Sequence, residues 1–357
     1  MAVKVYFSRL STDDDFDKAQ KKILELFKSA KLDECYKSGE VVGLKIHFGE
    51  EGNRGHIKPQ YVRPIVREIK SKGAKPFLTD TNTLYTGQRS NSVDHLHLAY
   101  KHGFAMENIE APVIISDGLL GDAETEVNIS GIHFKKVSLA TDAIKANALI
   151  VLTHITGHLA TGLGGAIKNV GMGLASRKGK MRQHSNMKPE VNDDKCTGCQ
   201  ECIQWCPTKA ISMKGEFAFI NRKICIGCGE CLTVCRFNAI KYNFRVESKI
   251  LQEKMAEHAL GVAKAKGDKI GYINFLWFVS KDCDCMATKD TDPVMKDIGV
   301  LASKDIIAID KACYDLIEKE TGKTIESYTY PHIDAQIQLR HGEKIGLGTM
   351  NYELIEI

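Results

Sequence analysis

The chain has 357 residues, of which 43% are hydrophobic and 26% are charged, the ordinary composition of a globular protein with two or three domains. Its net charge of +4 is too small and too diffuse to indicate nucleic-acid binding. The longest apolar run, Ile270 to Val279, has the length of a strand and falls short of the roughly 18 residues that a membrane-spanning helix requires.

Before residue 190, short apolar runs typical of strands alternate with amphipathic stretches typical of helices. The expected strands are Val3–Ser8, Val41–Phe48, Pro76–Thr79, Pro112–Ser116 and Ala148–Thr153. The expected helices are one that follows an acidic cap at Ser11–Asp15 and runs to about Ala30, then Pro59–Ser71, Val93–His102 and Thr141–Asn147. Glu124–Val137 is predicted to form a hairpin that turns at Ser130–Gly131. This alternation predicts an α/β fold with a mostly parallel sheet and helices on both faces.

The same alternation resumes after residue 247. The expected elements are a helix at Ser248–Lys266, strands at Lys269–Val279 and Asp305–Ile309, helices at Lys311–Thr321 and Ile333–His341, and a last strand at Glu353–Ile357. The simplest organisation is one α/β domain built from residues 1–190 and 248–357, interrupted by an inserted module at 191–247. Two separate α/β domains that flank the module are the alternative.

Eight cysteines in two matching runs define the inserted module. The runs are Cys196-x-x-Cys199-x-x-Cys202-x-x-x-Cys206-Pro207 and Cys225-x-x-Cys228-x-x-Cys231-x-x-x-Cys235. Their spacing resembles that of the bacterial two-cluster ferredoxins, over about residues 191–246, where the fourth cysteine of each run ligates the other cluster. We therefore expect an α+β ferredoxin module with two [4Fe-4S] clusters, the first held by Cys196, Cys199, Cys202 and Cys235 and the second by Cys225, Cys228, Cys231 and Cys206.

Zinc and disulfides are the rival explanations of these cysteines. Structural zinc usually takes separated pairs of ligands rather than such runs. Disulfides require an oxidising compartment, and the first eight residues are typical of a strand rather than an export signal. We therefore expect a cytoplasmic protein of an organism that limits oxygen.

A basic, glycine-rich stretch precedes the module. No acidic residue lies between Asp142 and Glu190, whereas seven lysines and arginines do. Within the stretch, Gly164, Gly165, Lys168 and Asn169 are predicted to bind an anion, because glycines let main-chain N–H groups approach it and the lysine supplies charge. The alternatives are a tight packing site for the glycines and a solvated or docking surface for the basic residues.

Polar side chains follow several predicted strands at the point where each strand ends. These are His47, Asp80, Asp117, His154 and the run Asp282–Cys285. Because ligands of an open parallel sheet bind beyond the carboxyl ends of its strands, we expect a shared cleft there. His47, His154, His158 and Lys168 are the candidate catalytic residues, the histidines as proton donors. Polar residues at strand ends are also common simply because strands end at the surface.

Cys283 and Cys285 form a second cysteine feature. They are predicted to bind a further metal or to act as a redox pair, and two inert thiols are the alternative. A metal would need partners such as His47, His154, His158 or His184, because two thiolates do not fill a tetrahedral shell.

Several blocks together resemble one known family. They are Lys45-Ile-His47-Phe-Gly49-Glu, Thr79-Asp80-Thr81-Asn82, His154-x-x-x-His158, Gly164-Gly165-Ala166-x-Lys168-Asn169-x-Gly171-Met172-Gly173 and the Asp282–Cys285 loop. They resemble the "domain of unknown function 362" (DUF362) proteins, many of which carry a two-cluster ferredoxin insertion. The resemblance implies an iron–sulfur protein but no established reaction, so no catalytic residue can be carried over.

Three functional hypotheses follow. The first is an iron–sulfur oxidoreductase that passes electrons through two [4Fe-4S] clusters to an anionic substrate or a metal in the α/β cleft. The second is a non-enzymatic electron carrier that docks to a larger redox partner, with a filled surface at Lys168. The third is a metal-handling protein that uses Cys283 and Cys285. The expected partners are an electron donor or acceptor protein and an anionic small molecule.

Overall fold

An eight-stranded sheet is the centre of the molecule in the computed structural model, which describes residues 2–357 except 86, 185–187, 226, 228–230, 232–233, 238 and 242–247. The strand order is β16-β1-β15-β14-β7-β2-β3-β4. The strands are β1 (Val3–Ser8), β2 (Val41–Lys45), β3 (Lys75–Asp80), β4 (Val113–Ile115), β7 (Ala148–His154), β14 (Ile270–Leu276), β15 (Gly299–Ser303) and β16 (Tyr352–Glu356). Only β15 runs antiparallel to its neighbours, so the expected α/β fold with a mostly parallel sheet is confirmed.

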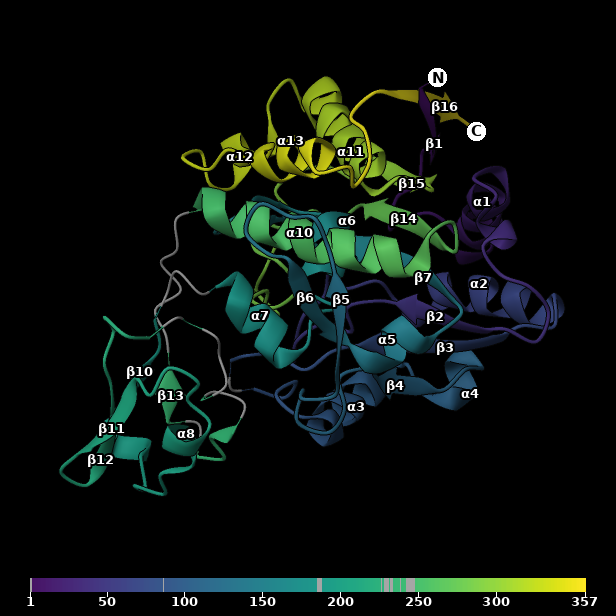
Figure 1. Cartoon of the computed structure of the whole chain (residues 1–357). Helices are drawn as coiled ribbons and strands as arrows, with labels where there is room; N and C mark the ends of the chain where they lie inside the picture. Colours follow the sequence, from purple (N-terminus) through teal and green to yellow (C-terminus); the bar gives the residue numbers. More distant parts are fainter. Residues whose placement is uncertain are drawn as a thin grey trace.

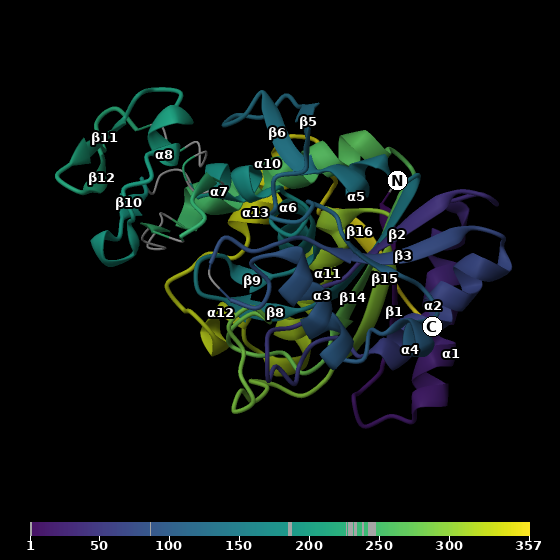
Figure 2. The ribbon, with the colours of Figure 1, turned by 90° about the horizontal axis from the view of Figure 1, so that it is seen from below.

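Helices cover both faces of the sheet, and alternate residues of the central strands pack against them. Leu149 and Val151 of β7 belong to one apolar cluster, whereas Ile150 and Leu152 belong to the other. The first cluster includes residues of α6 (Ala166–Gly171), α10 (Ser248–Lys266), α11 (Ile306–Thr321) and α13 (Ile337–Lys344). The second includes residues of α1 (Phe16–Ser29), α2 (Pro59–Ser71), α3 (Ser92–Lys101) and α4 (Met106–Ile109). Both layers are visible in Figures 1 and 2.

Local sequence signals placed most elements well. Asp15 caps α1 by accepting the N–H groups of Asp17 and Lys18, as the acidic cap predicted. The predicted helices Pro59–Ser71 and Ser248–Lys266 have the bounds of α2 and α10. The hairpin is present as β5 (Glu124–Asn128) and β6 (Lys136–Ala140).

The prediction of a strand at Asp305–Ile309 is wrong. Asp305 is the N-cap of α11 and accepts the N–H groups of Ile307 and Ala308, and the strand of this region is β15, Gly299–Ser303. The run Ile306–Ile309 is buried throughout, so its apolar pattern does not distinguish a helix from a strand. The predicted helix at Ile333–His341 begins later, at Ile337 in α13.

The remaining short elements connect the larger ones or lie in the cysteine segment. They are α5 (Thr141–Lys145), β8 (Thr156–His158), β9 (Gly162–Gly164), α7 (Arg177–Gln183), β10 (Glu190–Val191), α8 (Glu201–Gln204), β11 (Ile211–Lys214), β12 (Phe217–Ile220), β13 (Ile240–Lys241) and α12 (Ile325–Tyr328), with single 3-10 turns at Leu32–Glu34 and Asp193–Lys195. In the cysteine segment, β10 pairs with β13 and β11 pairs with β12. The segment projects from the α/β body beside α7 (Figure 1), and the strands of the large sheet come from both sides of it in the sequence.

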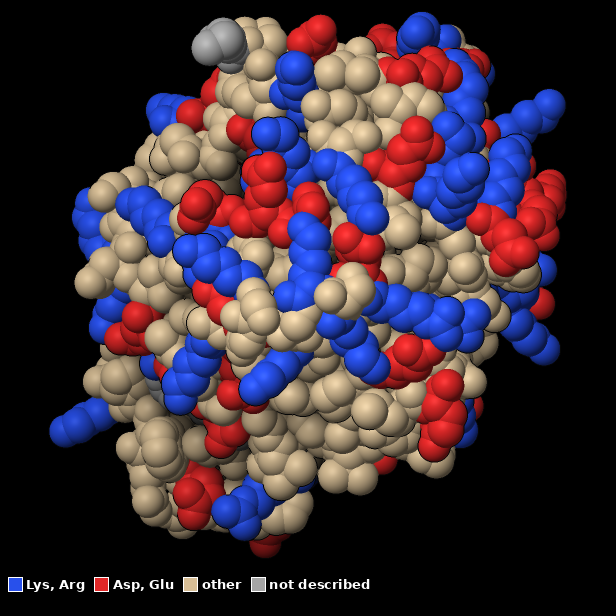
Figure 3. All heavy atoms as spheres, turned by 90° about the vertical axis from the view of Figure 1, so that its right-hand side faces the viewer, with Lys and Arg blue, Asp and Glu red and all other residues tan. Residues whose placement is uncertain are grey.

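Surface charge gives no sign of a polyanion-binding face on the side of α1 and α2. Lys and Arg side chains are interspersed there with Asp and Glu (Figure 3), so no single-sign field forms over that face. Among the described residues, no helix is both long and apolar enough to cross a membrane.

Candidate functional site

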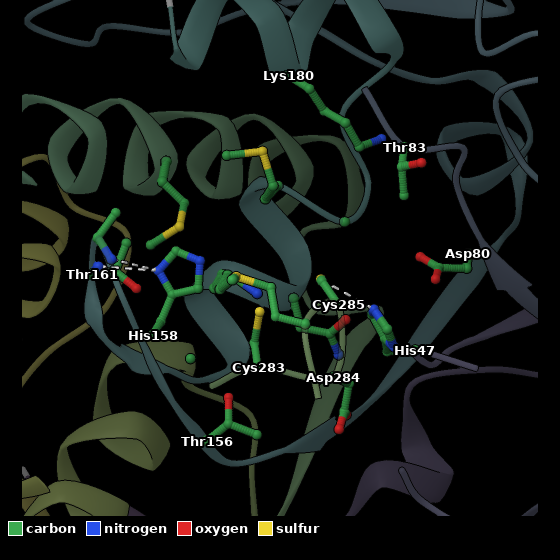
Figure 4. Close-up of a pocket in the computed structure, with 18 of the residues that line it drawn as sticks. His47, Asp80, Thr83, Thr156, His158, Thr161, Lys180, Cys283, Asp284 and Cys285 are labelled. Carbon is green, nitrogen blue, oxygen red and sulfur yellow. Dashed lines mark hydrogen bonds between the residues drawn. The ribbon is translucent and has the colours of Figure 1, made fainter. Parts of the chain in front are cut away.

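A cavity of about 450 Å³ lies beyond the carboxyl ends of β2, β3, β7 and β14. These strands are parallel neighbours, so the residues that follow them meet at one edge of the sheet. The cavity lining includes His47, Asp80, His154, His158, Gly164, Gly165, Lys168, Asn169, Cys283, Asp284 and Cys285. Figure 4 shows the side chains of His47, His158 and the cysteine turn around the same space.

The cysteine turn is the most reactive part of the lining. The N–H groups of Met286 and Ala287 donate to the carbonyl of Cys283, which closes a tight turn and sets both thiols on the cavity wall. The Sγ of Cys285 lies 3.4 Å from Nε2 of His47, and the side chains of Cys285 and Lys168 both hydrogen-bond to Cys283. His47 is held in place because its Nδ1 accepts the N–H of Gly49.

The two thiols have opposite acidities. The hydrogen bond from Cys285 and the ammonium of Lys168 together lower the pKa of Cys283 to about 6, although burial opposes this. The same hydrogen bond to Cys283, together with burial, raises the pKa of Cys285. Burial alone would lower the pKa of Lys168, but the neighbouring thiols Cys283 and Cys285 raise it. Cys283 is therefore the thiol that is ionised near neutral pH.

His154 supports the turn rather than facing a ligand. Its Nδ1 lies 3.0 Å from both carboxylate oxygens of Asp284, and its Nε2 lies 3.0 Å from the carbonyl of Trp277. Burial opposes protonation, but Asp284 and these hydrogen bonds raise the pKa of His154. Asn53 also donates to Asp284. With both ring nitrogens bound to protein, His154 has no proton to deliver to the cavity, and its predicted role as a proton donor is corrected.

His158 is held as a neutral ring. Its Nδ1 accepts the N–H groups of Ala160 and Thr161, and burial and the charge of Lys168 lower its pKa to about 3. It is therefore not an imidazolium acid near neutral pH. Of the predicted catalytic residues, His47 and Lys168 remain in direct contact with the reactive thiols.

The glycines pack tightly and do not form the predicted main-chain anion cradle. The N–H groups of Ala166 and Ile167 donate to the carboxylate of Asp310, so a residue of this chain occupies the start of α6. A Cβ built on Gly165 would lie 2.6 Å from that carboxylate, and one on Gly164 would lie 2.6 Å from the hydroxyl of Thr156. The packing alternative therefore explains both glycines, and only side chains of the stretch face the cavity as candidate anion ligands.

Asn169 orients a lysine that the sequence analysis did not single out. Its amide donates to Leu152 O and Thr153 Oγ1, and its oxygen accepts from Lys45 at 2.6 Å. Lys45 also contacts Asp80 at 3.0 Å. A lysine inside a buried strand was a visible signal of this role.

A second polar network lines the cavity around Asp80 and Arg89. Asp80 also contacts Arg89 at 3.3 Å, and Arg89 reaches Glu50 at 2.7 Å. Tyr85 donates to the same carboxylate of Glu50. Burial opposes ionisation of Asp80, but Lys45 and the neighbouring cations hold its pKa below the usual range. Arg89 and Tyr85 come from an irregular loop without a motif, so no local pattern indicated their role.

Asp117 lies behind the cavity wall. It accepts the main-chain N–H of Asn82, and Lys180 lies 4.0 Å from it. Burial raises the pKa of Asp117 to about 7. The ammonium of Lys180 faces the cavity and donates to Thr81. His56, on the loop after β2, stacks on His102 with ring centroids 4.5 Å apart, outside the lining.

The cysteine segment gathers the thiols expected around the first cluster. Burial, followed by the neighbouring thiols of Cys235, Cys199 and Cys196, raises the pKa of Cys202 to about 11. Main-chain N–H groups point at sulfur at the same offset in both runs, from Ala210 to Cys206 at 3.2 Å and from Ala239 to Cys235 at 3.3 Å. N–H groups directed at sulfur suit thiolates, so these residues fit a cubane.

Cys228, a predicted ligand of the second cluster, lies outside the described residues. Among the residues that the structure describes, no group of three or more His, Cys, Asp or Glu side chains is arranged to hold a metal ion. Thiolates around a cubane are held apart by the cluster itself, whereas ligands of a single ion converge on one point. Cys283 and Cys285 therefore lack the described ligands that a third metal would need.

Two hydrophobic residues connect the cysteine segment with the cavity. Leu84 lines the cavity and packs in the same apolar cluster as Cys202 and Cys231. Met181 of α7 belongs to that cluster too, and its neighbour Lys180 lines the cavity. The cavity and the cysteines therefore share a wall.

Comparison with known proteins gives a match to one family model, and thirteen chains of solved structures match as well. The model of the family described as "Domain of unknown function (DUF362)" matches residues 42–315. No curated protein matches the chain. Among solved structures, the chain is similar to the lactate racemase apoprotein from Thermoanaerobacterium thermosaccharolyticum, with 12% identity and a TM-score of 0.40 over 77% of this chain and 51% of that one. The chain spans about half the length of that protein, and so weak a similarity carries no functional argument.

Proposed function

The chain belongs to the DUF362 family, and from that premise and the geometry of its site we propose that it is an iron–sulfur oxidoreductase. Cys196, Cys199, Cys202 and Cys235 would hold one [4Fe-4S] cluster, and Cys225, Cys228, Cys231 and Cys206 the other. The clusters would supply one-electron transfer. The observation that carries the proposal is the shared wall, because Leu84 contacts both the cavity and the apolar cluster of cysteines.

An anionic small molecule is the proposed occupant of the cavity. Among the described lining residues, Lys45, Arg89, Lys168 and Lys180 are cationic, whereas Asp80 and Asp284 are the carboxylates. Both carboxylates are bound to cations of the protein, Asp80 to Lys45 and Asp284 to His154. The cations outnumber the carboxylates among these lining residues, which favours an anion.

An electron donor or acceptor protein is the proposed partner of the cysteine segment. Cys199 is exposed, and so are the apolar side chains of Trp205, Phe219, Ile224 and Phe237 on the same segment. Apolar side chains at a surface are typical of sites where another protein docks. The cluster nearest to Cys199 would therefore exchange electrons with the partner.

The cavity argues against the non-enzymatic carrier. That hypothesis expects a filled surface at Lys168, whereas Lys168 lines a cavity of about 450 Å³. Metal handling by Cys283 and Cys285 has less support, because the described residues offer no third ligand arranged for a metal ion.

Metal analysis of anaerobically purified protein tests the proposal. We expect about eight irons and about eight sulfides per chain, and an EPR signal of reduced cubanes after dithionite treatment. Cys202→Ser should remove about half of the iron, whereas Cys35→Ser should leave it unchanged because Cys35 lies in the core on the far side of the sheet. Zinc without iron would overturn the proposal.

Reoxidation kinetics test whether the cavity binds the anionic electron acceptor. In stopped-flow experiments, Lys168→Met should slow reoxidation of the reduced protein by small anionic oxidants more than by neutral ones. Lys145→Met is the matched control, since this exposed lysine lies in the same basic stretch but outside the cavity lining. Equal slowing of both variants would indicate a general charge effect.

A further inference from the structure

The two thiols of the cysteine turn have the arrangement of a redox dithiol. Cys283 and Cys285 are two residues apart on one tight turn, their side chains hydrogen-bond to each other, and both line the cavity. We propose that they form a thiol–disulfide exchange site for a small anionic disulfide, with Cys283 as the attacking thiol and Cys285 as the resolving thiol. The proposal goes beyond the function proposed above, because it concerns two cysteines outside the ferredoxin-like runs.

Lys168 makes Cys283 the attacking thiol. Its ammonium hydrogen-bonds to Cys283 from the first turns of α6, and Cys283 is 4% exposed, so the charge acts in a space with little water. The pKa of Cys283 is lowered to about 6 by Cys285 and Lys168. A thiol with a pKa close to the ambient pH is the best attacking group in disulfide exchange.

His47 supports the second step. Its Nδ1 accepts the N–H of Gly49, so in the neutral ring the proton lies on Nε2, which is 3.4 Å from the sulfur of Cys285 and donates toward it. This N–H stabilises the thiolate of Cys285 once its proton has been lost, after the thiolate of Cys283 has been consumed. A donor beside the resolving thiol completes a directional pair.

The reaction balances without a further reagent. The thiolate of Cys283 attacks one sulfur of a disulfide R–S–S–R, which forms a mixed disulfide and releases one RS⁻, and this RS⁻ takes the proton of Cys285. The thiolate of Cys285 attacks the sulfur of Cys283 in that mixed disulfide and releases the second RS⁻. The dithiol is oxidised to the Cys283–Cys285 disulfide, and R–S–S–R is reduced to one R–SH and one R–S⁻.

The other cysteines of the α/β body are unsuited to this chemistry. Cys35 and Cys313 are buried in the two core layers. Burial raises the pKa of Cys35 to about 11 and raises that of Cys313 well above the ordinary value. The contrast shows that burial alone produces an inert thiol, and that the contacts of Cys283 reverse this effect.

Charge and size define the substrate class. The carboxylates of the lining are bound to protein cations, whereas Lys168 adds positive charge beside the thiols and Lys180 lines the same cavity. The cavity of about 450 Å³ admits a compact molecule. Dithiodiglycolate, which is a dianion, 2-hydroxyethyl disulfide, which is neutral, and cystamine, which is a dication, are probes of similar size that differ in charge.

Mass mapping of anaerobically purified protein tests the proposal directly. Trypsin cleaves after Lys281 and Lys289, so one peptide carries both thiols. After dithiodiglycolate treatment, the wild-type peptide should be lighter by two hydrogen atoms. Cys285→Ser should hold the mixed disulfide on Cys283, and Cys283→Ser should remain unmodified. Dithiodiglycolate should react faster than the neutral probe, and the neutral probe faster than cystamine.

The role of Lys168 has its own readout. Lys168→Met should slow the reaction with dithiodiglycolate at pH 6 about fivefold for a rise of one unit in the pKa of Cys283, because the thiolate fraction then falls from about one half to about one tenth. At high pH the neutral probe should react with both proteins at similar rates, which a collapsed site would not allow. Lys145→Met is again the control.

Three outcomes would overturn the inference: an unreactive Cys283, equal reactivity of the two thiols, or a preference for cystamine. Iron and sulfide are measured in the same samples. Exchange without iron would remove the proposed oxidoreductase function and keep this inference, whereas iron without exchange would do the reverse.

Discussion

The cysteine segment and the cavity are built in opposite ways. The ligands of the segment lie within about forty positions of sequence, and their sulfurs accept N–H groups four residues away, as in Cys206 and Ala210. The cavity depends on contacts between distant residues, such as Cys285 with His47, 238 positions apart, and Asp284 with His154, 130 positions apart. We therefore expect the structure of the segment to depend on its cofactor more than on the surrounding domain, whereas the cavity depends on the large sheet.

Removal of metal is expected to have the largest effect and to separate the two regions. Because metal binding in small metal-bound segments is coupled to their folding, chelation of iron should expose residues 190–241 to fast amide exchange. Peptides of β7 and β14 should keep their protection, because these strands are buried throughout. Hydrogen exchange with mass spectrometry makes the measurement, and loss of protection in both regions would mean that they fold as one unit.

Loss of the buried ion pair should damage the cavity alone. His154→Gln leaves Asp284 as a buried charge without its cation, so we expect a loss of about 3–5 kcal/mol in the free energy of unfolding, with iron content unchanged. Urea denaturation measures it, and His332→Gln, at an exposed histidine, is the control. A loss below about 1 kcal/mol would mean that the pair is not charged.

The same pair has a defined pH window. The raised pKa of His154 gives stability that is full below the unfolded value, about 6.5, and is lost as pH rises through the folded value. The lowered pKa of Asp284 gives stability that is full above about 3.9 and is lost as pH falls through the folded value. The difference between wild type and His154→Gln should therefore be largest between about pH 4 and about pH 6.5. A difference that grew above that window would contradict the assignment.

Crowding at the glycine-rich stretch should have an intermediate effect. Gly165→Ala places a Cβ 2.6 Å from the carboxylate of Asp310, and we expect a loss of about 1–3 kcal/mol. Gly87→Ala has only the ring of Tyr85 within 4 Å, at 3.7 Å, and should be nearly neutral. If Gly165→Ala were neutral in thermal unfolding, close packing would not be the reason for the glycine.

The smallest effect is expected at a purely local feature. Asp15→Ala removes the cap of α1 and should lower the free energy of unfolding by about 1 kcal/mol. The loss should be the same with and without chelator, because α1 contacts neither the cavity nor the cysteine segment. Asp13→Ala, at an exposed position before the cap, serves as its control in urea denaturation. Equal losses for the two variants would remove the capping argument.

Features with a short range in sequence were predictable. The cap at Asp15, the bounds of Pro59–Ser71 and the parallel α/β pattern depend on neighbouring residues or on a regular period, and all were predicted. The cysteine spacing likewise predicts a ligand set, which stays a prediction. The strand predicted at Asp305–Ile309 was wrong because an apolar run buried on all sides has the same appearance in a helix and in a strand.

Only the tertiary structure decided which polar residues face the cavity. The sequence placed His47, His154 and Cys283 at strand ends. In the structure, His154 contacts Asp284, the carboxylate of Asp310 accepts an N–H group at the start of α6, and Lys168 hydrogen-bonds to Cys283. Each of these partners lies far away in the chain, where no local pattern records it. The residue type sets what a side chain is able to do, and the charges and hydrogen bonds that folding brings beside it set its protonation and therefore its chemistry.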